Sequence, residues 1–146
     1  MYIFDTREKK NLHIKNYFYR HGIPYRVEAL SVGDYMIDGG HVSGDRKQNL
    51  DELASNLLVR GDKGRFWREV RRAREQRIKL IVLCEHGGQI RTIRDVERWQ
   101  SKYTRIDGKA VQREICRVSI AYGVEFLFCD KRSTPRRIIE LLGGSV

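Results

Sequence analysis

The chain of 146 residues has 40% hydrophobic residues, two prolines, and 29 Lys and Arg residues against 19 Asp and Glu, for a formal net charge of +10. This length and apolar content predict a single domain over residues 1–146 and exclude an intrinsically disordered chain. No apolar run is long enough to span a membrane, and residues 1–5 lack the layout of a signal peptide, so we expect an intracellular location: cytoplasm or nucleoid, or the nucleus in a eukaryote. The excess of positive charge is typical of proteins that bind a polyanion such as nucleic acid.

The three cysteines, Cys84, Cys116 and Cys129, are widely spaced and form no Cys-x-x-Cys pair. Cys84 and Cys129 lie in apolar runs typical of strands, which favours buried free thiols over metal ligands or disulfides. Cysteine usage of this kind is typical of a reducing compartment.

The first third of the chain predicts strands and one helix, with a hairpin after them. A Gly39–Gly40 pair between two short strand-prone runs is typical of a hairpin turn. Gly22 ends a run of apolar residues at helical spacing. The predicted elements are a strand at 2–4, a helix at 7–21, a strand at 25–32, and hairpin arms at 35–38 and 41–43.

The remainder alternates helices with strands. Asn49 and Glu52 predict a capping box at the start of one helix, and Pro135 suits the first turn of the last. The predicted elements are a helix from 50, a loop at 61–64, a helix at 65–77, a strand at 80–84, a short helix at 92–99, a helix at 111–122, a strand at 124–129 and a helix from 133. Alternating strands and helices with one hairpin indicate an α/β fold: a mixed central β-sheet flanked by helices.

The most informative residues are Gly33-Asp34-Tyr35 and, further on, Asp45-Arg46-Lys47. Two acids and a lysine in the order Asp…Asp-x-Lys recur in metal-dependent phosphodiesterases, because carboxylate oxygens hold a divalent cation beside the attacking water. The strand period of two places Asp45 and Lys47 on one face of the second hairpin arm. Taken alone, each piece also has an ordinary explanation, since Asp is common in turns and Asp-x-Lys occurs by chance.

Four motifs in order resemble the nuclease domain of the XPF-type structure-specific endonucleases, a branch of the PD-(D/E)XK superfamily. The similarity runs from Tyr2 to about Glu85 and continues more weakly to the end. The motifs are Asp5-Thr6-Arg7-Glu8, Gly33-Asp34-Tyr35, Asp45-Arg46-Lys47-Gln48-Asn49-Leu50-Asp51 and Gly64-Arg65-Phe66. The resemblance implies a restriction-endonuclease-like core and a metal-dependent DNA endonuclease that cuts branched or flapped DNA.

Two features depart from the family pattern. The usual Glu of the third motif is Asp45, which is shorter by one methylene, although the wider superfamily accepts either acid. The sequence also ends at Val146 without the helix-hairpin-helix module or helicase domain common in the family. A nuclease subunit that needs a helicase or DNA-binding partner protein is therefore one alternative, and a catalytically weak DNA-binding module is another.

The resemblance implies that Asp34 and Asp45 are ligands of Mg²⁺ or Mn²⁺, with the Arg46 carbonyl as a further ligand. Lys47 then lies near the metal and the scissile phosphate. Adjacent carboxylates would keep its proton on, so we expect it to orient water and neutralise transition-state charge rather than act as a base.

Further charged residues have two interpretations each. Asp5 and Glu8 either form an outer shell or second metal position, or are acids in the first turn of a helix. Arg7 and Arg46 pair with these acids or with phosphate. Asp51 either supports the site or is explained by its place at a helix N-terminus.

Nine basic residues against three acidic ones lie between Arg60 and Lys79. Arg65, Arg68 and Arg72 share one helical face, which is either solvated or contacts DNA phosphates, and the excess of arginine favours phosphate. We expect this face to bind DNA away from the chemistry.

A homodimer is a further expectation from the family resemblance. Nuclease domains of the family pair through helices near the C-terminal end, which correspond to 110–122 and 135–142. Both are apolar enough to need cover, which the protein's own sheet could also supply.

Overall fold

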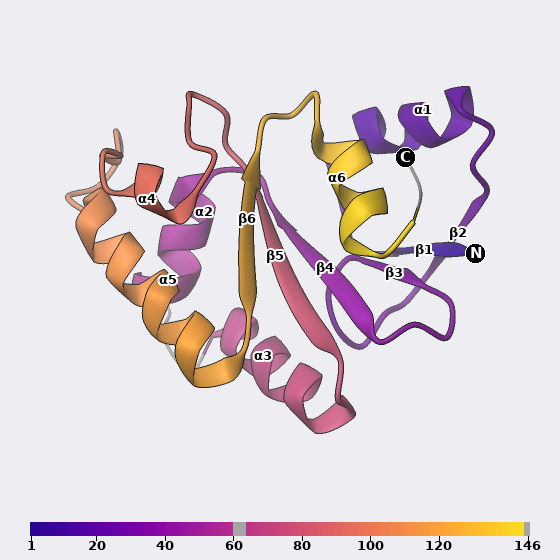
Figure 1. Ribbon diagram of the computed structural model, residues 1–146, viewed down its shortest axis with the longest axis horizontal. Helices are drawn as coiled ribbons and strands as arrows, with labels where there is room; N and C mark the ends of the chain where they lie inside the picture. The colour runs from indigo at the N-terminus through magenta and orange to yellow at the C-terminus, as the bar shows by residue number, and fades with distance from the viewer. Residues whose placement is uncertain (60–63, 145–146) are drawn as a thin grey trace.

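The computed structural model describes residues 1–59 and 64–144, and in this part of the chain a six-stranded mixed sheet is flanked by helices on both faces (Figure 1). The strand order is β2-β1-β3-β4-β5-β6. The strands are β1 (Tyr2–Asp5), β2 (Tyr25–Glu28), β3 (Tyr35–Ile37), β4 (Val42–Lys47), β5 (Lys79–Glu85) and β6 (Glu125–Cys129). β3 is antiparallel to both β1 and β4, whereas the β1–β2, β4–β5 and β5–β6 pairs are parallel. The mixed sheet predicted from the sequence is confirmed.

The helices divide between the two faces of the sheet (Figure 1). Helices α1 and α6 pack together on one face, and the others cover the opposite face. The helices are α1 (Leu12–Arg20), α2 (Leu50–Ala54) with its π-helical continuation η1 (Ser55–Val59), α3 (Arg65–Gln76), α4 (Ile93–Val96), α5 (Gly108–Tyr122) and α6 (Thr134–Leu141).

Strand β5 is covered on both faces, as its continuous apolar run predicts. Leu80, Val82 and Cys84 face the larger core under α2, α3 and α5, while Leu83 faces the smaller core under α1 and α6. Its parallel neighbour β4 is therefore central too, and its last residues are held at a rigid position in the sheet.

Several predicted elements are shorter in the structure. The second strand ends at Glu28 instead of Val32, and the first helix begins at Leu12 because residues before it form turns, with Lys10 at a φ of 54°. The short helix ends at Val96, since the next three backbone N–H groups, from Glu97 to Trp99, donate to carbonyls three residues back and form turns. Of the predicted loop at 61–64, residues 61–63 lie outside the described part of the chain.

The three cysteines are free, and Cys84 and Cys129 are buried, as predicted. Within residues 1–59 and 64–144 no helix is long and apolar enough to cross a membrane.

Candidate active site

Asp34 is held at the edge of β3 by a glycine that no other residue can replace without strain. Gly33 has a φ of +73°, and a Cβ there would lie 2.0 Å from Ser43 Oγ. Asp34 N donates to the Gly44 carbonyl at 2.7 Å, and its own carbonyl accepts from Asp5 N at 2.8 Å. The Asp34 carboxylate accepts from Arg46 N at 2.8 Å. Strands β1 and β4 thus fix both the backbone and the side chain of Asp34.

Asp45 and Lys47 lie side by side on one face of β4, as the strand period predicts. Lys47 Nζ is 3.1 Å from Asp45 Oδ2, and both side chains are buried. The ammonium also lies 5.1 Å from the centre of the Phe66 ring on α3, within the range of a cation–π contact. Burial opposes the charge of Lys47, but Asp45, Asp34 and Glu69 outweigh it and raise its pKa. Lys47 is therefore protonated at neutral pH.

Arg46 points to the opposite face of β4, into a buried ion cluster. Its guanidinium donates to Glu8 at 2.7 Å, to Glu85 at 3.1 Å and to the Lys9 carbonyl at 2.7 Å. The second oxygen of Glu85 contacts His13 Nε2 at 2.8 Å and accepts from the Thr134 hydroxyl. The sequence identified Arg46 and Glu8 but not Glu85, which is hidden at the end of an apolar strand.

Glu8 and Asp5 precede α1, so the interpretation that they are acids in its first turn is wrong. No acid lies in that turn. Glu8 is half-buried beside Asp34 and accepts from Arg46 and from the Tyr35 hydroxyl at 2.7 Å.

Asp5 is buried and bound to Arg7 at 3.0 Å and to Leu30 N at 2.7 Å. Burial alone would raise its pKa, but the bonds from Arg7 and Leu30 prevail and lower it. Asp5 and Arg7 therefore tie the loop before Gly33 to β1.

Asp51 lies in the first turn of α2 and accepts from the Ser101 hydroxyl at 2.6 Å. It is not among the residues that line the cleft with Asp34 and Asp45. Its position agrees with the explanation from a helix N-terminus.

The acids and the lysine open into one cleft of about 670 Å³ between β4, the loop after β1 and α3. Asp34, Asp45, Lys47 and Glu8 line it on the sheet side. A groove of about 400 Å³ adjoins it and shares Asp34 and Glu69 with it. The predicted catalytic residues on the hairpin and the loop before α1 thus converge.

The arginines of α3 lie closer to these acids than we expected. Arg65 and Arg68 line both the cleft and the groove, and Arg72 lines the groove. Arg72 also donates from Nε to the Ser31 carbonyl at 2.8 Å, which ties α3 to the loop before Gly33. Phosphate-binding groups and acids therefore share one surface.

Glu69 is a residue of the cleft that the motif analysis missed. It lies on α3 between Arg68 and the buried Val70, one turn after the buried Phe66. Burial and the nearby Asp45 carboxylate raise the pKa of Glu69 to about 8. An acid next to the inward apolar stripe of α3 is the sequence signal that could have indicated it.

The acids of the cleft suit a divalent cation. Burial, Asp45 and Glu8 raise the pKa of Asp34 well above its usual range, so the negative charges are not balanced by the protein alone. Glu69 Oε1 is buried without a hydrogen-bond partner among the described residues, and Asp45 Oδ2 is buried with Lys47 Nζ 3.1 Å away. No group of three or more His, Cys, Asp or Glu in the same residues is arranged to hold a metal ion. A site with few protein ligands and retained waters is the kind that Mg²⁺ prefers.

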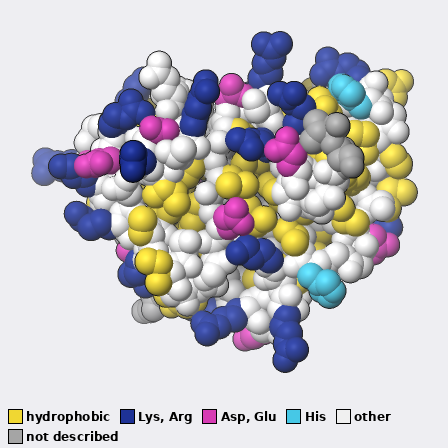
Figure 2. Space-filling model, viewed as in Figure 1, with side chains coloured by type: hydrophobic (Ala, Val, Ile, Leu, Met, Phe, Trp, Pro, Cys, Tyr) yellow, Lys and Arg dark blue, Asp and Glu magenta, His cyan; other side chains and the backbone are white. Residues whose placement is uncertain are grey.

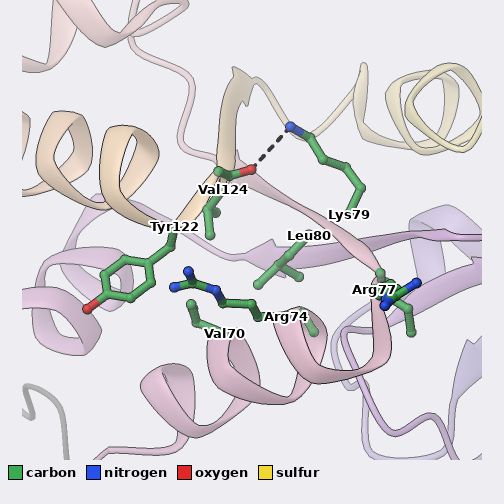
Figure 3. A pocket seen from close by; sticks show the side chains of 10 residues that line it. Val70, Arg74, Arg77, Lys79, Leu80, Tyr122 and Val124 are labelled. Atoms are coloured by element: carbon green, nitrogen blue, oxygen red, sulfur yellow. Dashed lines mark hydrogen bonds between the residues drawn. The ribbon is translucent and has the colours of Figure 1, made fainter.

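A second pocket, of about 270 Å³, lies at the other end of α3 (Figure 3). Arg74 lies 5.9 Å from the Tyr122 ring, and Lys79 Nζ donates to the Gly123 carbonyl at 3.1 Å. The pocket contains no acid, so it offers no ligand for a cation and is not the candidate active site.

The mixed sheet and the motif residues at the ends of its central strands define an XPF-type nuclease domain. The sequence matches the family model of the ERCC4 domain over residues 4–142, and the chain belongs to this family. No match is found among curated proteins.

Solved structures share the fold. XPF from Aeropyrum pernix matches with a TM-score of 0.71 at 17% identity, over 97% of this chain and 62% of that chain. XPF from the same organism in complex with DNA matches with a TM-score of 0.72 at 17% identity, again over 97% of this chain and 62% of that one. This chain thus spans less than two thirds of the length of the structures it matches.

Proposed function

We propose that this chain is a metal-dependent DNA endonuclease that hydrolyses phosphodiester bonds. The observation that carries the proposal is the cleft in which Asp34, Asp45 and Lys47 meet beside Arg65 and Arg68. Anionic groups for a cation and cationic groups for phosphate are both needed to cut a polyanion, and here they line one surface.

In the proposed reaction, Asp34 and Asp45 hold Mg²⁺ or Mn²⁺. A bound divalent ion supplies Lewis acidity and lowers the pKa of its water ligand. Arg46 N keeps the Asp34 carboxylate in place, with a hydrogen bond of 2.8 Å. Protonated Lys47 neutralises charge that develops on the scissile phosphate, and its contact with Asp45 and Phe66 holds the ammonium in position.

Branched or flapped DNA is the proposed substrate. The family membership and the likeness to an XPF that was solved in complex with DNA support DNA binding. We propose as an alternative that a helicase or DNA-binding partner protein contributes to the choice of DNA structure.

The test is a cleavage assay on labelled flap, fork, four-way junction and linear duplex DNA with Mg²⁺, Mn²⁺ or EDTA. We expect cleavage of branched substrates with either metal and none in EDTA. Cleavage in excess EDTA would refute the metal dependence. Binding to all substrates without cleavage under any condition would favour the alternative, a catalytically weak DNA-binding module.

We also propose a homodimer that pairs through α5 and α6, the helices predicted at 110–122 and 135–142. Val111, Ile115, Ile138 and Ile139 are buried against the protein's own sheet, whereas Ile120 on α5 is 87% exposed and available to a second copy. β6 is the edge strand, and a groove of about 530 Å³ beside it is lined by Phe126, Leu127, Phe128 and residues 91–94.

The face that contains this edge supports pairing. Figure 2 shows hydrophobic side chains near its centre, with charged side chains among them and around them. Sedimentation over a micromolar concentration range tests the proposal, and a monomer throughout would refute it.

A further inference from the structure

Asp45 on β4 and Glu69 on α3 line the same cleft, where the Asp45 carboxylate helps to raise the pKa of Glu69. Asp45 is 4% exposed and Glu69 is half-buried. Glu69 Oε1 is buried without a hydrogen-bond partner among the described residues, and Asp45 Oδ2 is buried with Lys47 Nζ 3.1 Å away. The positive charges of Lys47 and Arg72 act on Glu69 and oppose the rise of its pKa.

This arrangement is unfavourable in the protein alone. A buried carboxylate is stable when donors satisfy its oxygens, and an unsatisfied buried polar atom costs about 1–3 kcal/mol. Two facing carboxylates both accept and neither donates, so a proton or a cation must lie between them. A strained pair of this kind persists in a fold when it serves a site.

The short side chain of Asp45 is a further feature of this pair. Asp45 is one methylene shorter than the Glu usual at its place in the motif. Glu69 extends from the facing helix into the same cleft and meets Asp45 there.

We infer that Glu69 belongs to the cation site and accepts a hydrogen bond from a water ligand of the ion held by Asp34 and Asp45. The inference rests on the proposed function, because it needs that ion. A water-mediated contact agrees with the absence of a three-acid metal cluster among the described residues, and Mg²⁺ usually retains several of its waters. Glu69 is thus a positioning residue for the cation, carried by the helix that also carries Arg65 and Arg68.

The effects of replacing Glu69 with Gln should differ without and with metal. Without metal, the uncharged amide of Glu69→Gln can donate to Asp45, so the melting temperature should not fall. With metal, the variant lacks the anionic partner of the bound water, and loss of such an outer partner typically weakens metal binding about 10–100-fold. A residue that only stabilised the fold would lower the melting temperature in both conditions.

The experiment measures Mn²⁺ binding by electron paramagnetic resonance, and melting temperature with and without Mn²⁺. It compares the wild type with Glu69→Gln, with Asp34→Asn, and with Glu75→Gln. Glu75 is exposed on the same helix and does not line the cleft, so it is the matched control. We expect Mn²⁺ binding at least about tenfold weaker in Glu69→Gln and unchanged in Glu75→Gln.

The outcomes separate the two proposals. Wild-type binding that Asp34→Asn abolishes and Glu69→Gln leaves intact would overturn the role of Glu69 and leave the proposed function standing. A wild type that binds no Mn²⁺ up to millimolar concentrations would overturn the cation site itself, and the role of Glu69 with it. A metal-free Glu69→Gln variant that melts at a lower temperature would show that Glu69 stabilises the fold, which also contradicts the inference.

Discussion

The charged residues on the two faces of β4 differ in whether all of their polar atoms have a partner. On one face, each nitrogen of the Arg46 guanidinium donates to an acceptor, and Glu8 and Glu85 receive these bonds. On the other face, the acids Asp45, Asp34 and Glu69 lie together beside Lys47, and Glu69 Oε1 is buried without a hydrogen-bond partner among the described residues.

Arg46 and its neighbours Asp45 and Lys47 therefore have different roles. The satisfied cluster around Arg46 joins β4 to the loop before α1, to β5 and, through Thr134, to α6. The under-satisfied acids leave a place for a cation. A rigid, fully bonded cluster behind the strand is what allows strained acids in front of it to keep their positions.

The largest expected effect is on catalysis at the under-satisfied face. Asp34→Ala or Asp45→Ala removes a carboxylate that the proposed metal needs, so the single-turnover cleavage rate should fall by orders of magnitude while the fold persists. Asp38→Ala, at an exposed position on the hairpin, is the control. Normal cleavage by both active-site variants would show that the acids are not metal ligands.

The opposite face should respond through stability. Arg46→Met leaves Glu8 and Glu85 without their buried partner, and breaking a buried ion pair in this way costs about 3–5 kcal/mol. Urea denaturation of the metal-free protein measures the free energy of unfolding. An Arg46→Met protein as stable as the wild type would show that the ion cluster on this face does not stabilise the fold, which would contradict the proposed difference between the two faces.

Lys47→Ala should lower turnover more than it weakens DNA binding, by roughly 10²–10³-fold if its charge acts on the transition state. Lys47→Arg should restore little, because a planar guanidinium does not replace a compact ammonium beside Asp45 and Phe66. Rates at saturating DNA separate turnover from binding. Full activity of the arginine variant would mean that any positive charge suffices.

The arginines that line the cleft should contribute to binding and, more weakly, to turnover. Replacing Arg65 and Arg68 with Ala should flatten the log–log dependence of DNA affinity on salt by about 0.9 per lost phosphate contact. Arg71→Ala is a control, since Arg71 is exposed on α3 and does not line the cleft or the groove. An unchanged salt dependence in the double variant would place the DNA elsewhere.

The smallest effect concerns His86, which follows β5 and stabilises the start of α2. Its Nδ1 accepts from Leu50 N at 3.0 Å, and burial lowers its pKa below the ordinary 6.5, against a weaker opposite effect of Asp51. The folded state thus binds the proton less tightly than the unfolded state, so this stability is present above pH 6.5 and is lost as pH falls through the folded pKa.

His86→Asn, which keeps an acceptor, should remove that part of the pH dependence at a cost of about 1 kcal/mol or less. Denaturation curves at several pH values test this. A pH profile identical to that of the wild type would assign the dependence to other groups.

Local patterns determined much of this protein. The alternation at Asp45 and Lys47, the Asn49 cap, the apolar run of β5 and the hairpin before β4 each depend on neighbours in sequence, so they were predicted. The motif residues were identified by the same means, because each motif lies within a short stretch of chain.

Only the tertiary structure brought distant segments together. Glu69 meets Asp45, and Glu85 meets Arg46, because α3 packs over one face of the sheet and β5 pairs with β4. The structure also placed Arg65 and Arg68 beside the acids and tied Arg72 to Ser31. Sequence periodicity does not reveal which residue a charged side chain will contact. The packing of helices and strands decides which segments meet, and the residues beside a charged residue in the chain do not.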